Sequence, residues 1–163
     1  MAKRVLMVIT PARARAGDLV SAARSAAAVA RESGGVVRMA WIRALPAPRV
    51  DRYDRLVADT DREMARLTAA ALEHMAALAW EFGEVEVERV VRFGRLSTEL
   101  AIEAHAWGAD LIGLAVPERP GPRHRFHAWY LARAVSVPVV LLPIGRPEGG
   151  QRRRESMALP ALR

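Results

Sequence analysis

Two short apolar runs near the end of the chain constrain its fold more than any other feature. They are residues 110–116 (DLIGLAV) and 139–142 (VVLL), and between them lie a loop rich in proline and arginine and a short amphipathic segment. Runs without polar alternation indicate strands that are covered on both faces. Two such strands joined through a helix are parallel, and ligands bind outside the carboxyl ends of strands in sheets of this kind. The loop at residues 117–125 is therefore where a ligand is first expected.

The rest of the chain repeats this alternation of apolar runs and helical spacing. The predicted strands are Arg4–Ile9, Val36–Ile42, a third run marked by Val85, Val87 and Val91, then Asp110–Val116 and Val139–Leu142. The predicted helices cover residues 18–33, a long stretch from about 51–54 to 80, residues 96–107 and residues 126–135. Trp41 and Trp80 are expected in the core. The sequence thus predicts an α/β three-layer sandwich, with a five-stranded, mostly parallel sheet and two helices on each face.

Length and charge indicate one domain followed by a basic tail. The 163 residues suit a single domain, here residues 1–145. The net charge is +7, and residues 146–163 contribute five arginines and two glutamates, or +3. This tail lacks periodicity and is expected to be disordered, so its removal should leave the fold intact. The positive charge is consistent either with solubility or with an anion-binding surface, and nucleic acid is not the expected partner.

The chain contains no cysteine, no apolar run long enough to span a membrane and no recognisable signal peptide. We expect a cytoplasmic protein without disulfides. His124 and His127 have the spacing of metal ligands on one helix face, but no third ligand is evident nearby, so no metal site is expected. Trp129 and Tyr130 are expected in the core or in an interface. No nucleophile–base pair is present, so the sequence does not indicate an enzyme.

Several segments resemble the universal stress protein family. EAHAWGADLIGL resembles its helix, Gly-Ala-Asp and strand signature, and SVPVVLLP resembles its closing strand. VLMVITPA and GGVVRMAWI resemble its first two strands. The resemblance implies an adenine nucleotide alpha hydrolase-like, Rossmann-like fold. It also implies a homodimer that pairs through the last strand, with interface candidates Val139, Val140, Leu141 and Leu142.

Some members of that family bind ATP through an aspartate after the first strand and a loop of the form Gly-x2-Gly-x9-Gly-Ser/Thr. Here the corresponding positions are Thr10, Ala115, Glu118 and Arg125-Phe126, and the segment is about three residues shorter. Prolines also remove backbone donors from the loop. The resemblance therefore implies a regulatory or protective protein that has no cofactor and acts on an unknown protein partner without ATP.

Two alternatives stay open. The first is an adenine-nucleotide (ATP or AMP) binder with an altered, arginine-lined loop. Its candidate contacts, by position in the family pattern, are Thr10, Ile42, Ala115, Gly121, Arg123 and Arg125. The second is a nucleic-acid-associated protein that uses the arginine-rich tail.

Overall fold

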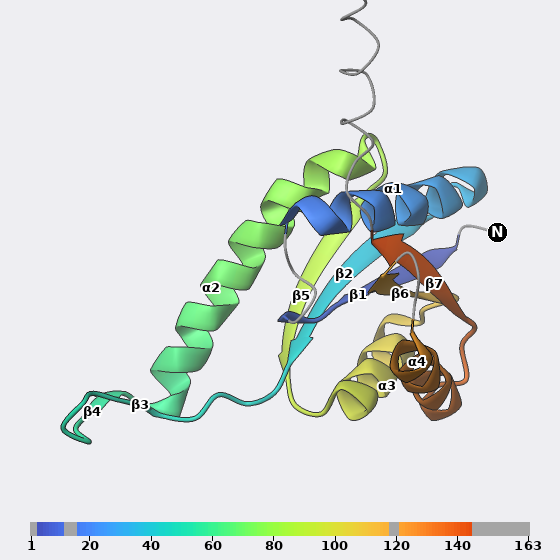
Figure 1. The fold of residues 1–163 in the computed structure, drawn as a ribbon. Coiled ribbons are helices and arrows are strands. Elements are labelled where there is room, and N and C mark those ends of the chain that lie inside the picture. Colours follow the sequence, from blue (N-terminus) through green and yellow to red (C-terminus); the bar gives the residue numbers. More distant parts are fainter. Residues whose placement is uncertain (1–2, 12–15, 118–120, 145–163) are drawn as a thin grey trace, which may run out of the picture.

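The computed structural model describes residues 3–11, 16–117 and 121–144. The strands are β1 (Arg4–Ile9), β2 (Val36–Arg43), β3 (Arg49–Val50), β4 (Leu56–Ala58), β5 (Val87–Phe93), β6 (Leu111–Pro117) and β7 (Val139–Ile144). The helices are α1 (Ala16–Ser33), α2 (Thr60–Ala79), its 3-10 extension η2 (Trp80–Phe82), α3 (Leu96–Trp107) and α4 (Pro122–Ala134). Strands and helices alternate along the chain as expected, apart from the added hairpin β3–β4 (Figure 1). The basic tail at residues 146–163 lies outside the described residues.

Five strands form one sheet in the order β5-β2-β1-β6-β7, and every neighbouring pair is parallel. Strand β1 lies at the centre and is buried at five of its six positions. It can be apolar throughout because helices cover both faces of the sheet. The predicted five-stranded parallel sheet is confirmed.

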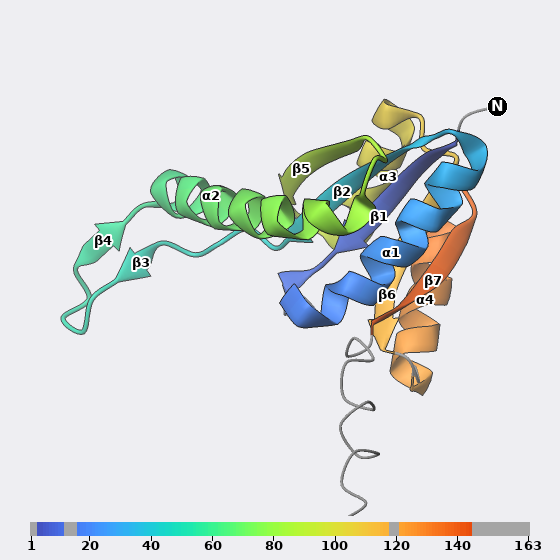
Figure 2. The same ribbon diagram turned by 90° about the horizontal axis from the view of Figure 1, so that it is seen from above.

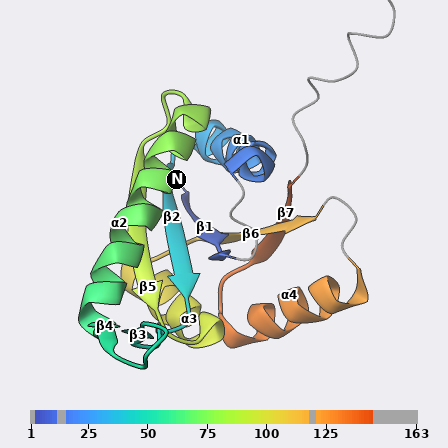
Figure 3. The same ribbon diagram turned by 60° about the vertical axis from the view of Figure 1, so that its left-hand side comes forward.

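Helices α1 and α2 lie on one face of the sheet, and α3 and α4 lie on the other (Figure 3). Helices α1 and α2 share one apolar core with the sheet, and α3 and α4 share the other. The inner face of α1 is made of small residues, which allows the helix to lie close to the strands. These are Ala22, Ala23, Ala26, Ala27 and Ala30, all buried.

The hairpin β3–β4 replaces the expected first turns of the second helix. The Asp51 carboxylate accepts hydrogen bonds from the backbone N–H groups of Tyr53 (2.8 Å) and Arg55 (3.1 Å), and Asp54 adopts a positive φ of 60°. Such side-chain bonds stabilise a turn at the expense of a helix. The hairpin projects beyond the sheet together with the start of α2 (Figure 2).

Helix α2 begins at Thr60, later than predicted, because Asp59 caps it. The Asp59 side chain accepts from the N–H of Arg62 at 2.9 Å. At the other end, the helix tightens into η2, which directs Phe82 into the core and leaves Trp80 87% exposed. The expectation that Trp80 is a core residue is wrong.

Helix α4 begins at Pro122 rather than at Phe126, since proline suits the first turn of a helix. Its outer face carries Phe126, Trp129 and Tyr130, which are all exposed. In the single chain, Trp129 and Tyr130 are therefore not core residues.

Strand β7 forms one edge of the sheet, as expected for the last strand. Leu142 is buried in the core under α1, and Val139 packs against the core on the α3 and α4 side. Val140 and Leu141 remain 36% and 42% exposed. Two of the four interface candidates are thus available for contact with another chain.

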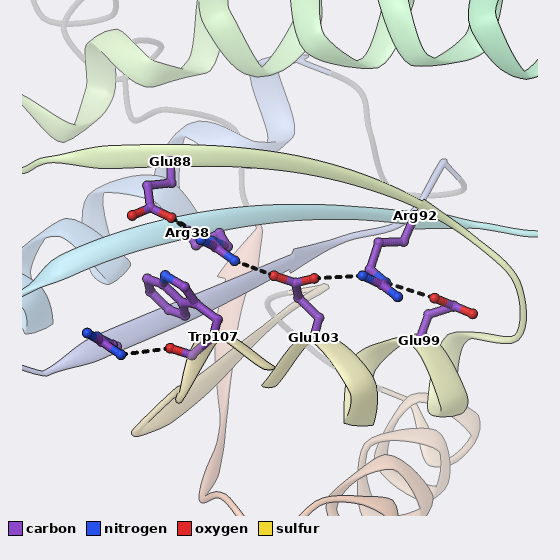
Figure 4. A network of polar contacts seen from close by, with 7 residues as sticks. Arg38, Glu88, Arg92, Glu99, Glu103 and Trp107 are labelled. Atoms are coloured by element: carbon purple, nitrogen blue, oxygen red, sulfur yellow. Dashed lines mark hydrogen bonds and ion pairs between the residues drawn. The ribbon is translucent and has the colours of Figure 1, made fainter. Parts of the chain in front are cut away.

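A charged network fixes α3 against β2 and β5 (Figure 4). Arg38 of β2 donates to Glu88 of β5 and, at 2.5 Å, to Glu103 of α3. Arg92 of β5 lies 3.0 Å from the second oxygen of Glu103 and 2.8 Å from Glu99. The Glu99 hydrogen bond is the main cause that raises the pKa of Arg92 above its ordinary value. Glu103 is buried, and each of its carboxylate oxygens is paired with one arginine. This pairing offsets the cost of burying the negative charge.

The C-terminal end of α3 is tied to the first strand. The Arg4 backbone N–H donates to the Asp110 carboxylate at 2.8 Å, and the Arg4 guanidinium donates to the Trp107 carbonyl at 2.9 Å. Gly108 ends the helix with a left-handed φ of 69°. Together with the charged network, these contacts hold α3 against the sheet.

Candidate functional site

A cleft lies at the carboxyl ends of β1, β2, β5 and β6. In the sheet order, the chain moves from β1 outward to β2 and β5, then returns to β6 on the other side of β1. The connections after β1 and β6 therefore leave in opposite directions, which opens a crevice in sheets of this class. The sequence predicted that a ligand would bind at this edge of the sheet.

Two cavities, of about 820 and 410 Å³, make up the cleft. They share four residues, Thr10, Leu96, His127 and Leu131, and are therefore continuous. The larger is also lined by Pro11, Ile42, Arg43, Ala44, Leu45, Pro46, Gly94, Arg95, Ser97 and Tyr130. The smaller is also lined by Val8, Leu114, Ala115, Val116, Arg123, His124 and Ala128. Cavities of this size accept metabolite-sized ligands.

The walls of the cleft combine apolar side chains with arginines. Arg43, Arg95 and Arg123 line it, and no aspartate or glutamate does so among the described residues. Neither Arg95 nor Arg123 forms an ion pair within the described part of the chain. The described lining therefore carries a positive formal charge, which favours an anionic ligand.

Two buried polar atoms of the lining have no hydrogen-bond partner among the described residues. They are Nε of Arg43 and Nδ1 of His124. Both atoms are screened from solvent, so neither is presented to the open part of the cleft.

The loop before α4 offers few backbone donors. Pro117 ends β6 and Pro122 begins α4, and neither has an N–H group. Gly121 is the N-cap residue of α4, without a side-chain cap bond. Residues 118–120 lie outside the described ranges.

The structure brings four of the six predicted nucleotide contacts into the cleft. Thr10 lines both cavities, Ile42 lines the larger one, and Ala115 and Arg123 line the smaller one. The remaining two, Gly121 and Arg125, line neither cavity.

Four other lining residues were not among the predicted nucleotide contacts. Arg43, Arg95, Ser97 and Tyr130 all lie in the larger cavity. A usable signal existed for the first three, because Arg43 ends a predicted strand and Gly94–Thr98 joins the next strand to a helix at the same edge of the sheet. His124 and His127 both line the smaller cavity, but the described residues contain no group of three potential metal ligands.

The parallel sheet, the crevice beside β1 and the basic lining define a doubly wound α/β protein with a small-molecule cleft. The family model described as "Universal stress protein family" matches residues 1–143, nearly the whole described chain. The chain belongs to the universal stress protein family.

Comparison with solved structures gives the same fold at low sequence identity. A universal stress protein in complex with cAMP is 15% identical, with a TM-score of 0.58, over 88% of this chain and 98% of that one. An Archaeoglobus fulgidus universal stress protein in complex with dAMP is 17% identical (TM-score 0.52; 87% and 98% covered). An Arabidopsis thaliana family member with AMP bound is 13% identical (TM-score 0.54; 90% and 97% covered).

Comparison with curated proteins gave no significant match. Within the described residues, none of the helices combines the length and the apolar character needed to cross a membrane.

Proposed function

We propose that this chain is a regulatory or protective binding protein of the stress response whose cleft holds a nucleoside monophosphate, and that it does not depend on ATP. One observation carries the proposal: the described lining joins apolar walls to three arginines and contains no carboxylate. Apolar walls suit the base, and arginines suit a phosphate dianion.

The loop before α4 is the reason to propose a monophosphate rather than a triphosphate. A triphosphate needs many donors along its length, and Pro117 and Pro122 supply none from the backbone. Each missing hydrogen bond to a charged group weakens binding by roughly 1.5–3 kcal/mol, or about tenfold or more. A single phosphate needs fewer donors, and the arginines of the cleft can supply them.

The related structures give independent support for this ligand class. Three of them are described as complexes with cAMP, dAMP or AMP. Each of these ligands has an adenine and one phosphate group. The proposed ligand differs from the sequence-based expectation of no cofactor. We propose it because the cleft is open and basic, although the loop before α4 departs from the ATP-binding pattern of the family.

We further propose that the protein is not an enzyme. Histidine is the commonest general base, and His124 and His127 line the cleft, but no carboxylate that could orient either ring lines its described part. We also propose a cytoplasmic homodimer paired along β7, where apolar residues remain exposed on an edge strand.

Calorimetric titration with AMP, adenosine and ATP at physiological salt tests the proposed ligand. We expect AMP to bind in the micromolar range, ATP at least about tenfold more weakly, and no product on prolonged incubation followed by phosphorus NMR. Thr10→Phe, which fills the part shared by both cavities, should abolish the binding of AMP. Thr98→Phe, on the exposed surface of α3, is the matched control. Absence of AMP binding, or tighter binding of ATP, would refute the proposal.

A further inference from the structure

Helix α4 has two opposite faces, and the fold uses only one of them. Its buried residues, Ala128 and Leu131, pack into the core that the helix shares with α3. Phe126, Trp129 and Tyr130 form its aromatic face and are 66%, 54% and 47% exposed. Because each residue of a helix turns by about 100°, the mean direction of the three aromatic side chains is opposite to that of the two buried ones. The aromatic face therefore points away from the sheet.

Neither the cleft nor the edge of the sheet accounts for the aromatic face. Phe126 and Trp129 line neither cavity of the cleft, although Tyr130 lines the larger one. The free edge of β7 lies in the plane of the sheet, whereas α4 covers one face of it (Figure 3). Exposed apolar clusters with a polar surround mark interaction surfaces. The aromatic face thus calls for a partner other than the ligand of the cleft.

The exposed charges around the aromatic face are basic. Arg125 and Arg133 are exposed and form no ion pair within the described part of the chain. The two glutamates of α3 do not offset them, because Glu99 is bonded to Arg92 and Glu103 is buried. Helix α4 itself has no acidic residue. Every fully exposed charged side chain of α3 and α4 in the described structure is therefore basic.

The helices on the other face of the sheet have a mixed charge pattern. Helices α1 and α2 expose the carboxylates of Glu32, Asp61 and Glu73 among their arginines. The α3–α4 side is thus set apart by its uniform sign, which selects an anionic partner. A second copy of α4 does not fit this face, because two helices with only basic charges repel each other.

The arrangement of the rings favours a bilayer surface over a nucleic acid. The Arg133 guanidinium lies 5.0 Å from the centre of the Trp129 ring, and the Phe126 ring lies 5.8 Å from that centre with a tilt of 32°. Nucleic-acid bases stack on open ring faces, whereas these rings are packed on one another and on an arginine. Ile102 of α3, 46% exposed, adds an apolar side chain to the same helix layer. Aromatic and aliphatic side chains beside arginines suit the headgroup level of a membrane.

We propose that the outer side of α3 and α4 is a peripheral binding surface for anionic lipid bilayers. The aromatic face enters the headgroup region, and Arg125 and Arg133 bind lipid phosphates. Helix α4 stays packed on the sheet through Ala128 and Leu131, so binding needs no refolding of the domain. The surface is distinct from the nucleotide cleft, and the inference does not rest on the proposed ligand.

Co-sedimentation of the full chain with phospholipid vesicles tests the charge of this surface. We expect binding to vesicles of mixed phosphatidylglycerol and phosphatidylcholine, and binding at least about tenfold weaker to phosphatidylcholine alone. Arg125→Gln and Arg133→Gln should each weaken binding to the anionic vesicles about fivefold, the factor that one basic residue near such a surface contributes. Arg62→Gln, at an exposed position of α2, is the matched control and should change binding less than about twofold.

Tryptophan fluorescence tests whether α4 enters the bilayer. Trp41 and Trp107 are buried, so a shift of the emission to shorter wavelength on addition of vesicles reports on Trp129 or on Trp80. We expect the shift in wild type and in Trp80→Phe, which removes an indole that is 87% exposed on the other side of the sheet. Trp129→Phe should abolish the shift. The double variant Phe126→Ser and Trp129→Ser should weaken vesicle binding about tenfold or more, because it removes the apolar contacts.

Each outcome supports or overturns the inference. Failure of wild type to bind anionic vesicles overturns it, and so does a shift that persists in Trp129→Phe. Unchanged binding in the arginine and aromatic variants would show that another basic segment holds the lipid, which also contradicts the inference. The arginine variants decide the question even if the double variant unfolds, because Arg125 and Arg133 are exposed.

Two further measurements on the same variants identify the other possible partners. Loss of binding to a single-stranded oligonucleotide in the arginine variants, without vesicle binding by wild type, would make the face a nucleic-acid site. A decrease in molar mass on light scattering of the double variant, again without vesicle binding by wild type, would make it a contact between two copies. Either result replaces the proposed lipid surface.

Discussion

Replacement of Glu103 by glutamine tests the charged network between α3 and the sheet. Glu103 is 3% exposed, and its two oxygens bind Arg38 and Arg92. The amide keeps the shape of the side chain but turns one acceptor into a donor that faces a guanidinium. One arginine then loses its partner in a buried site.

The size of the effect follows from burial and from the remaining partners. Loss of one member of a fully buried ion pair costs about 3–5 kcal/mol. Arg38 and Arg92 are 24% and 27% exposed, and each keeps a second carboxylate, so the cost should fall at or below the lower limit of that range. We expect a loss of about 2–3 kcal/mol, equivalent to a decrease of roughly 5–10 °C in Tm for a chain of this size.

Urea unfolding followed by circular dichroism measures the difference in free energy of unfolding. Glu81→Gln is the matched control, since its partner Arg24 is 64% exposed and such surface pairs contribute about 0–1 kcal/mol. The Glu103→Gln effect should persist in about 1 M salt, where exposed pairs are screened. A change within about 0.5 kcal/mol of wild type would refute the argument that the network stabilises the fold.

Three other predictions concern the core, the acid range and the edge of the sheet. Phe82→Ala should lower the free energy of unfolding by about 3–5 kcal/mol in the same urea assay, because Phe82 is fully buried; a loss below about 1 kcal/mol would contradict this. The Arg66 hydrogen bond lowers the pKa of Glu63, so its contribution is present above the ordinary glutamate pKa and is lost as the pH falls through the lower pKa of the folded state. Glu63→Gln should therefore lose less stability than wild type on acidification, and parallel acid-unfolding curves would count against this reasoning. Leu141→Asp should convert the proposed dimer to a monomer in light scattering, because it places a charge on the apolar edge of β7; a wild-type monomer, or a mutant that remains dimeric, would exclude β7 as the interface.

The sheet and its helices were predictable because apolar runs and helical spacing are local signals. The hairpin was not predicted because residues 51–54 suit a helix start as well as a turn, and the side-chain bonds of Asp51 favour the turn. Trp80 lies off the apolar stripe that ends in Leu78 and Phe82, so its exposure was readable from the sequence. Glu103 and Ala104 are neighbours in α3 and both are buried. A carboxylate at a buried position indicates that basic side chains pair with it.

The location of the candidate site was predictable from the sequence, but only some of the residues that line it were. Parallel strands bring their carboxyl ends to one edge, which identifies Thr10 and Ile42 as neighbours. The presence of Arg43 and Arg95 in one cavity depends on the β2–β5 register, which pairs Arg43 with Phe93 and has no local sequence signal.

The sheet order also has a consequence for how the chain folds. Strands β1, β2 and β5 are neighbours on one side of the sheet, whereas β6 must return to β1 and is fixed there by the bond between Arg4 and Asp110, 106 residues apart. Closing so long a loop costs entropy before any contact repays it, and parallel sheets with such contacts fold slowly. We expect the amides of β1 and β2 to become protected before those of β6 and β7 in pulse-labelled hydrogen exchange during refolding. Simultaneous protection of both halves would show that the long closure is not the late step.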